Sequence, residues 1–263
     1  MIHSSPLLIE HRSGGVTLLT LNNQDRRNAL DPPLAQALLD VVPVLIADPS
    51  VRCVVITGAG RAFCSGADLA GLRADASGGL LQLREKLGNF YNVFLGIREL
   101  PMPVIGAING GAIGAGLNLA LCCDVRIAGR SAKFGATFVH LGIHPGGGAT
   151  YLLTRLVGPG VAAELLLSGT IVDAEKALSM RLVNQIVDDS EVVKSALALA
   201  ATIAANSQQA VRATKRTLAV AIDASFAATL EVETLTQAIT QGTEDAVEGW
   251  TAFQQRRAPR FGA

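Results

Sequence analysis

The sequence predicts an α/β protein with a helical C-terminal region, and three observations support this class. Residues 104–108 (VIGAI) are an apolar run suited to a buried strand, and the glycine-rich turn that follows leads into an apolar helix. Residues 51–57 (VRCVVIT) are a second β-branched run, and a glycine-rich loop follows it too. From about residue 188 the pattern is almost wholly helical.

These patterns divide the chain of 263 residues into two parts. We expect an α/β core over residues 1–190 and a helical region over residues 191–263, acting as a lid or an oligomerisation region. Lysine plus arginine equals aspartate plus glutamate, at 22 each, and no basic run occurs. This charge balance does not favour nucleic acid or an anionic membrane as a partner. Residues 1–15 lack a charged start followed by a long apolar segment, so we expect a cytoplasmic protein.

The chain begins with a predicted hairpin. Residues 9–20 carry two short extended segments around Ser13-Gly14-Gly15. A polar loop, residues 21–30, follows. Asp31 and the prolines after it then have the pattern of an N-cap and a first helical turn, so a helix with one apolar face is expected from residue 32.

The middle of the chain alternates predicted helices and strands. Gly71, Gly78 and Gly79 interrupt the pattern before an amphipathic helix over residues 80–100. Residues 134–135 begin a short extended piece, and three glycines precede a helix over residues 149–157. Residues 161–187 alternate helix and strand signals. Five large apolar residues lie on this helix and are candidate core residues: Leu80, Leu83, Leu87, Phe90 and Phe94.

Chemistry is expected where the two glycine-rich stretches meet. Gly114 and Gly116 bracket Ala115 in the first turn of the central helix, where backbone N–H groups have no intrahelical partner. The loop over residues 58–69 is a second stretch of exposed backbone. Two such loops can place two N–H donors around one oxygen, as the stabilisation of an enolate or tetrahedral oxyanion requires.

Several separated motifs, in order from about residue 10 to the end, make the sequence similar to the crotonase superfamily of enoyl-CoA hydratases and isomerases. They are GAGRAFCSGADL, PVIGAINGGAIGAGLNLALCCDVRIA, FGATFVHLGIHPGGGATYLLTRLVG, AELLLSGTIVDAEKALSMRLVNQIV and EGWTAFQQRRAPRF. The resemblance implies a core of repeated ββα units wound as a spiral, with a helical appendage. It also implies an acyl-CoA substrate, no tightly bound cofactor apart from coenzyme A within the thioester, and a homotrimer or dimer of trimers.

The same resemblance implies roles for particular residues. It places the helix over residues 80–100 beside an acyl pocket, where its five large apolar residues would affect chain-length selectivity; the alternative is that they are plain core residues. Ser65 and Ala115 would give their backbone N–H groups to a thioester carbonyl. Arg26 and Arg27 would contact phosphates of coenzyme A, although paired loop arginines are commonly just solvated. The remaining implied coenzyme A contacts are Gly66, Ala67 and Asp68 in the first loop, where Asp68 also has a bracing role, and Phe253 and Arg256, which would reach the coenzyme from a neighbouring subunit.

The chain departs from the hydratases where they carry two glutamates. Asn118 and Phe138 occupy those positions, and neither side chain can transfer a proton at neutral pH. Two nearby histidines, His140 and His144, are candidate replacements, with Asn118 orienting a water. If the segment is extended, His140 shares a face with position 138.

The lost glutamates leave other functions open. A non-catalytic acyl-CoA-binding protein is one alternative, and a decarboxylase or thioester hydrolase on the same scaffold is another. Cys64 lies beside the first loop, but no activating base is assignable, so it is interpreted as a small packing residue. The cysteines have no metal-ligand spacing, and no metal is expected.

Overall fold

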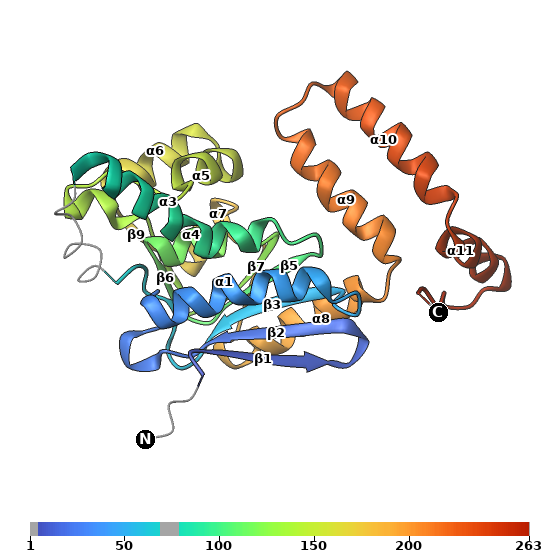
Figure 1. Ribbon diagram of the computed structural model, residues 1–263, viewed down its shortest axis with the longest axis horizontal. Coiled ribbons are helices and arrows are strands. Elements are labelled where there is room, and N and C mark those ends of the chain that lie inside the picture. The colour runs from blue at the N-terminus through green and yellow to red at the C-terminus, as the bar shows by residue number, and fades with distance from the viewer. Residues whose placement is uncertain (1–4, 69–78, 263) are drawn as a thin grey trace.

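The structure is a computed structural model that describes residues 5–68 and 79–262. Within these ranges two β-sheets form the centre and helices cover them (Figure 1). Gly71 and Gly78, which the sequence analysis interprets as helix breakers, lie outside the described residues. The larger sheet consists of β1 (Leu7–Arg12), β2 (Val16–Leu21), β3 (Cys53–Gly58), β5 (Val104–Ile108), β7 (Val125–Gly129) and β10 (Gln185–Val187), in that spatial order. The smaller sheet consists of β4 (Ala62–Cys64), β6 (Gly111–Ile113), β8 (Lys133–Gly135) and β9 (Ile171–Asp173).

A ββα unit is repeated along the chain. In each unit the first strand joins the larger sheet in parallel, the second strand joins the smaller sheet, and a helix follows. The units are β3-β4 with α3 (Gly79–Arg98), β5-β6 with α4 (Ala115–Leu121) and β7-β8 with α5 (Ala149–Val157). The predicted strand over 104–108 and the predicted helices over 80–100 and 149–157 are confirmed, and so is the α/β class.

The N-terminal hairpin and the first helix also form as predicted. β1 and β2 pair antiparallel from Leu7↔Leu21 to Arg12↔Val16, and Gly14 takes a φ of 75° in the turn. Helix α1 (Pro32–Ala47) begins after Asp31, whose Oδ1 accepts a hydrogen bond from the Leu34 N–H at 3.2 Å. This cap leaves the apolar face of α1 directed at the core.

Two apolar layers enclose the larger sheet. On one face lie α1, α3, α4, α5, α6 (Pro159–Ser168) and α7 (Ala174–Ser179). On the other face lies α8 (Val192–Ala204), which buries a residue every four positions (Val192, Ala196, Ala200 and Ala204) against the strands. Helix α8 therefore packs as part of the core although it follows residue 190, and the division of the chain at that point stays a prediction.

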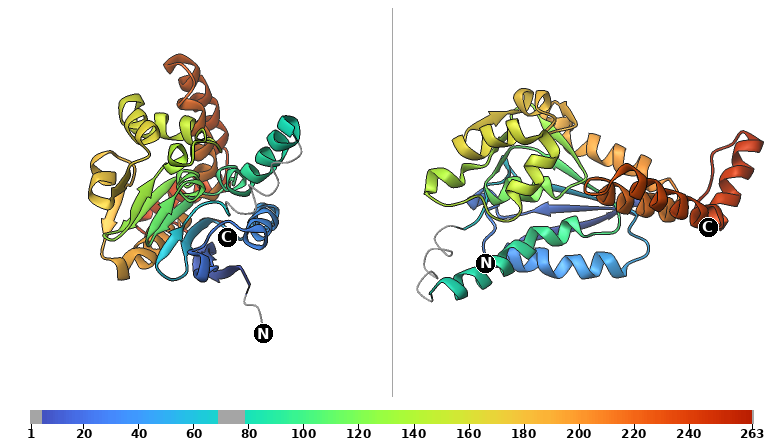
Figure 2. Two further views of the ribbon diagram at one scale, coloured as in Figure 1. Left: turned by 90° about the vertical axis from the view of Figure 1, so that its left-hand side faces the viewer. Right: turned by 90° about the horizontal axis from the view of Figure 1, so that it is seen from above.

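The last three helices project from this core, as Figure 1 and the right-hand view of Figure 2 show. They are α9 (Gln208–Ala221), α10 (Phe226–Gln241) and α11 (Glu244–Gln255), and the predicted helical C-terminal region is confirmed. Large apolar side chains along them are exposed: Leu218, Ile222, Phe226, Leu230, Leu235, Ile239, Val247, Trp250 and Phe253. Over the described part of the chain, none of the helices combines the length and the apolar character needed to cross a membrane.

Candidate functional site

The connection from β6 to α4 presents a backbone donor. Gly114, at a φ of 56°, turns the chain after the strand, and its N–H donates to the Gly135 oxygen at 2.8 Å. Ala115 is the first helical residue, so its N–H has no acceptor within the helix. Elsewhere among residues 5–68 and 79–262 no acceptor for this N–H is found. A donor of this kind is available to a ligand oxygen.

A second donor arises in the loop that follows β4. Leu30 and Ala67 form a parallel bridge, in which the Leu30 N–H donates to the Gly66 oxygen at 2.8 Å and the Asp68 N–H donates to the Leu30 oxygen at 3.4 Å. In a trans peptide the N–H points opposite to the C=O. Because the Gly66 C=O points at Leu30, the Ala67 N–H points away from it.

The backbone N–H of Ser65 is not available for the role that the resemblance implies. Its backbone N–H donates to the Arg27 oxygen at 3.0 Å, and its hydroxyl donates to the Arg26 oxygen at 3.0 Å. The Ser65 N–H is therefore engaged within the protein, whereas Ala67, two residues later, has an N–H for which no acceptor is found among residues 5–68 and 79–262. Sequence reasoning placed the loop but could not tell which of its peptides faces a ligand.

The two donor loops are in direct contact. Gly66 has a φ of 105°, and a Cβ there would lie 2.7 Å from the Ile113 oxygen and 3.5 Å from the Ala115 nitrogen. Gly116, the second residue of α4, lies against the Cys64 oxygen, with no room for a Cβ. Glycine at both positions lets the backbones approach, which brings Ala67 and Ala115 near one another.

The two expected phosphate contacts differ in their surroundings. Arg26 donates from Nη2 to Asp68 Oδ1 at 2.8 Å and from Nη1 to Asp68 Oδ2 at 3.1 Å, and Asp31 lies 3.6 Å away. The hydrogen bond with Asp68 raises the pKa of Arg26, and the charge of Asp68 adds to this. The exposed Arg27 makes no ion pair within the described ranges.

Asn118 lies one turn after Ala115 and is 1% exposed. Its Nδ2 donates to the Gly146 oxygen at 2.9 Å, which ties α4 to the loop that precedes α5. Its Oδ1 is buried and has no hydrogen-bond partner among the described residues. The side chain therefore keeps one unused acceptor. Phe138, at the other expected glutamate position, is partly buried against the core.

The histidines do not take the arrangement expected for an extended segment. Residues Thr137–Leu141 form the 3-10 helix η4, in which three residues complete a turn, so His140 does not share a face with Phe138. His140 is exposed, and its Nε2 lies 2.9 Å from the Ser168 oxygen at the end of α6. His144 is exposed at the start of the loop that Asn118 contacts through Gly146.

Sequence reasoning passed over Tyr91, a hydroxyl-bearing residue on α3. The Tyr91 Oη lies against Gly146, and it makes no hydrogen bond to the rest of the described chain. Its ring packs beside Phe90 and Phe94 at centroid distances of 6.4 and 6.2 Å. The sequence does contain a signal for Tyr91, because its hydroxyl group lies among the apolar aromatic residues Phe90 and Phe94.

The residues of this helix that were expected beside an acyl pocket differ in their exposure, since Leu80 is 81% exposed and Phe94 is fully buried.

Phe253 and Arg256 lie at the end of α11, and Phe253 is 77% exposed. Figure 1 shows α11 in the projecting region, far from the start of α4. Within one chain these two residues therefore do not join the other candidate site residues.

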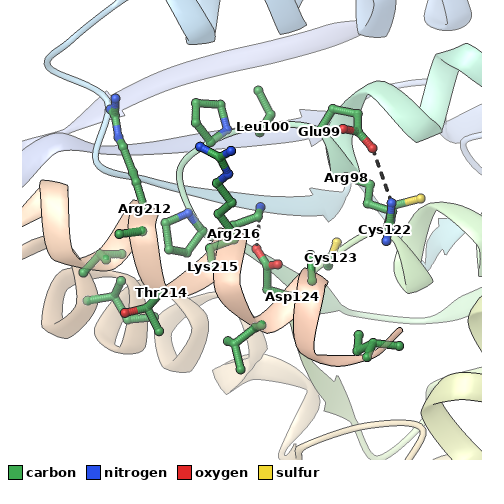
Figure 3. Close-up of a pocket in the computed structure, with 18 of the residues that line it drawn as sticks. Arg98, Glu99, Leu100, Cys122, Cys123, Asp124, Arg212, Thr214, Lys215 and Arg216 are labelled. Atoms are coloured by element: carbon green, nitrogen blue, oxygen red, sulfur yellow. Dashed lines mark hydrogen bonds and ion pairs between the residues drawn. The ribbon is translucent and has the colours of Figure 1, made fainter. Parts of the chain in front are cut away.

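A groove of about 1010 Å³ lies between the core and α9, at the opposite end of α4 from Ala115. Figure 3 shows Arg212, Lys215 and Arg216 of α9 on one side of it. Lys215 pairs with Asp124 at 2.8 Å, and Asp124 also accepts from the Val104 N–H at 2.7 Å. None of the predicted site residues lines this groove, so we place the candidate site at the two donor loops, where unengaged N–H groups meet.

The thiols are unsuited to nucleophilic chemistry. Burial raises the pKa of Cys64 to about 12, and burial likewise raises the pKa of Cys53 and Cys123 to about 12 and that of Cys122 still further.

We expect all four thiols to resist a disulfide reagent in the native protein at neutral and mildly alkaline pH, because the thiolate is the reactive form. Counting modified thiols by absorbance, before and after addition of denaturant, checks this. Rapid modification of Cys64 in the folded protein would contradict it.

Comparisons with known proteins identify the family of this chain. The profile of the enoyl-CoA hydratase/isomerase family matches residues 11–263. The chain is 46% identical over 203 residues to a probable enoyl-CoA hydratase, EchA14, of Mycobacterium tuberculosis, covering 77% of each. It is 35% identical to the 1,2-epoxyphenylacetyl-CoA isomerase of Escherichia coli, covering 97% of each. The crystal structure of an enoyl-CoA hydratase from Bacillus anthracis superposes with a TM-score of 0.91 at 33% identity, over 97% of this chain and 98% of that one.

Proposed function

The chain belongs to the enoyl-CoA hydratase/isomerase family, within the crotonase superfamily, and from this premise we propose that it acts on an acyl-CoA thioester held by the N–H groups of Ala67 and Ala115. One observation carries the proposal. Two loops that contact each other at Gly66 and Gly116 each present a backbone N–H with no acceptor in the described part of the chain.

Both donors would bind the thioester carbonyl oxygen. When a proton leaves the neighbouring carbon, or a nucleophile adds, negative charge moves onto that oxygen and strengthens both hydrogen bonds. Each such donor is typically worth about 3 kcal/mol to a transition state. Because the donors are backbone groups, a side-chain change such as Ala67→Ser keeps them.

Proton transfer requires other groups, because Asn118 and Phe138 stand where hydratases carry glutamates. The Tyr91 Oη lies against Gly146, the residue whose oxygen accepts from Asn118, and His144 precedes Gly146 by two residues in the same loop. We propose these two groups, with His140, as candidates for the acid and base. Asn118 would orient a water through its unused Oδ1, which can accept a hydrogen bond.

The coenzyme A part of the substrate would extend towards the loop that carries Arg27. We propose a homotrimer or a dimer of trimers, in which Phe253 and Arg256 reach the coenzyme of a neighbouring subunit. The apolar side chains exposed along α9, α10 and α11 support burial of this region against another chain. A cytoplasmic location stays a prediction.

The test is loss of the conjugated-thioester absorbance when purified protein meets crotonyl-CoA, with boiled protein as the blank. We expect turnover in the wild type, and expect His144→Ala or Tyr91→Phe to lower kcat by roughly 10²-fold or more, as loss of a general acid or base does. Equal loss in His140→Ala would instead assign the role to that histidine. No turnover of any thioester in a broad panel would overturn the proposal.

Two alternatives are tested by analysing what becomes of the thioester after incubation with the protein. The absence of both glutamates favours a non-catalytic acyl-CoA-binding protein, for which the thioester would bind tightly and be recovered unaltered. Decarboxylation or thioester hydrolysis needs less acid–base machinery than hydration and would release carbon dioxide or free coenzyme A.

A further inference from the structure

The guanidinium of Arg26 is directed at protein carboxylates. Its two terminal nitrogens bond the two oxygens of Asp68 at 2.8 and 3.1 Å, the bidentate geometry that arginine favours. Asp31 lies 3.6 Å away and also accepts from Asn23 Nδ2 at 2.7 Å. The side chains of Asp68 and Asp31 are 16% and 14% exposed, so both carboxylates are largely withdrawn from water. The guanidinium is therefore already paired within the protein, which does not favour a role in binding a phosphate.

Around this ion pair the segments 26–30 and 59–68 are joined by side-chain and backbone hydrogen bonds. Asn28 is fully buried, and its Nδ2 donates to the oxygens of Ala59 and Ala62 at 3.0 and 2.8 Å. Arg27 and Asn28 adopt left-handed conformations, with φ of 52° and 56°, which turn the chain so that Leu30 can bond Gly66. The position of each segment therefore depends on the other.

The bonds on the two sides of Ala67 differ in length. Before Ala67, the Gly66 oxygen accepts from the Leu30 N–H at 2.8 Å. After Ala67, the Asp68 N–H reaches the Leu30 oxygen at 3.4 Å, which is a weak hydrogen bond. The Asp68 side chain, held bidentately by Arg26, is a strong contact on that second side.

We propose that Arg26 is a positioning residue: through its bidentate pair with Asp68 it holds the Ala67 N–H in the direction that a ligand oxygen requires. This inference rests on the proposed donor role of Ala67 and replaces the expected phosphate contact at Arg26. Asp68 follows Ala67 directly, so release of its carboxylate loosens the peptide unit after Ala67. The peptide unit that carries the Ala67 N–H is then held by the Leu30–Gly66 hydrogen bond at 2.8 Å, with only the weak 3.4 Å bond of Asp68 on its other side. A misplacement of about 1 Å can cost about 10²-fold in rate.

The experiment uses two thioesters, crotonyl-CoA and the crotonyl thioester of N-acetylcysteamine, which lacks every phosphate. For Arg26→Gln we expect kcat to fall by roughly 10- to 100-fold with both substrates and KM to change by less than about threefold. Arg130→Gln is the matched control, because Arg130 also pairs with two carboxylates, Glu175 at 3.3 Å and Asp188 at 3.0 Å, and contacts no candidate site residue. The control should leave both constants unchanged.

A spectroscopic measurement tests the same point without turnover. The infrared carbonyl stretch of a ¹³C-labelled thioester shifts to lower frequency when two N–H groups polarise it. We expect Arg26→Gln to lose much of this shift while the bound fraction is kept, and expect Asp68→Asn combined with Arg26→Gln to add little, because both changes remove one ion pair. Arg26→Lys keeps the positive charge but cannot make the bidentate pair with Asp68. Its shift of the carbonyl stretch should therefore lie between those of the wild type and Arg26→Gln.

The outcomes separate the inference from the proposed function. If the wild type neither turns over a thioester nor shifts its carbonyl stretch, the proposed function fails, and the positioning role fails with it. If the wild type turns over a thioester or shifts its carbonyl stretch, and Arg26→Gln does so to the same extent, the positioning role fails while the proposed function stands. An increase of KM confined to crotonyl-CoA would identify Arg26 as a phosphate contact and overturn the inference.

Discussion

Gly116→Ala is expected to abolish most of the activity. A methyl group at this position meets the backbone oxygen of Cys64, and neither α4 nor β4 can yield by a side-chain rotation. The start of α4 must then move away from β4, which separates the Ala115 N–H from the Ala67 N–H. Loss of one such donor lowers kcat by about 10²- to 10³-fold, and the overpacking should lower the free energy of unfolding by about 1–3 kcal/mol.

Gly88→Ala is the matched control. Gly88 lies within α3, and a Cβ there meets nothing within 4 Å. Alanine in an open helical position stabilises by about 0.5–1 kcal/mol, so this variant should be slightly more stable and fully active. Steady-state kinetics and urea unfolding of both variants check the prediction. Full activity in a folded Gly116→Ala protein would show that the site does not depend on the contact between the two loops.

Arg126→Met is expected to cause a large loss of stability. Arg126 is 4% exposed, and burial lowers the pKa of its guanidinium. Its Nη1 donates to the Cys123 oxygen at 2.5 Å and its Nε to the Leu182 oxygen at 2.8 Å. Methionine fills similar space but leaves these carbonyl groups without that donor. A buried polar group without a partner costs about 1–3 kcal/mol, so we expect a loss of about 2–4 kcal/mol after allowing for the removed buried charge.

Arg130→Met is the comparison for this variant. Arg130 is exposed and its ion pairs lie at the surface, so its replacement should change the free energy of unfolding by less than about 0.5 kcal/mol. Urea unfolding at neutral pH gives both values. An Arg126→Met protein as stable as the Arg130→Met protein would contradict a structural role for the buried guanidinium.

Much of the fold could be predicted from local pattern. The helix over residues 149–157 and the strand over residues 104–108 occur at the expected positions, because glycine turns and apolar periodicity act within a few residues. The role of Arg126 could not be predicted in this way. Its acceptors come from Cys123 and from Leu182, which is 56 residues away in the sequence. No local pattern indicates such a partner.

For the candidate site, the sequence by itself predicts which two loops carry it, and it predicts from the family resemblance that Asn118 and Phe138 stand at two glutamate positions. The tertiary structure decided which N–H of the first loop is unengaged, since the hydrogen bonds that engage Ser65 and turn Ala67 outward come from residues 26–30. It also placed His140 beside Ser168 and Tyr91 beside Gly146. The direction of a peptide and the neighbour of a side chain depend on distant segments, whereas composition and spacing describe only the chain itself.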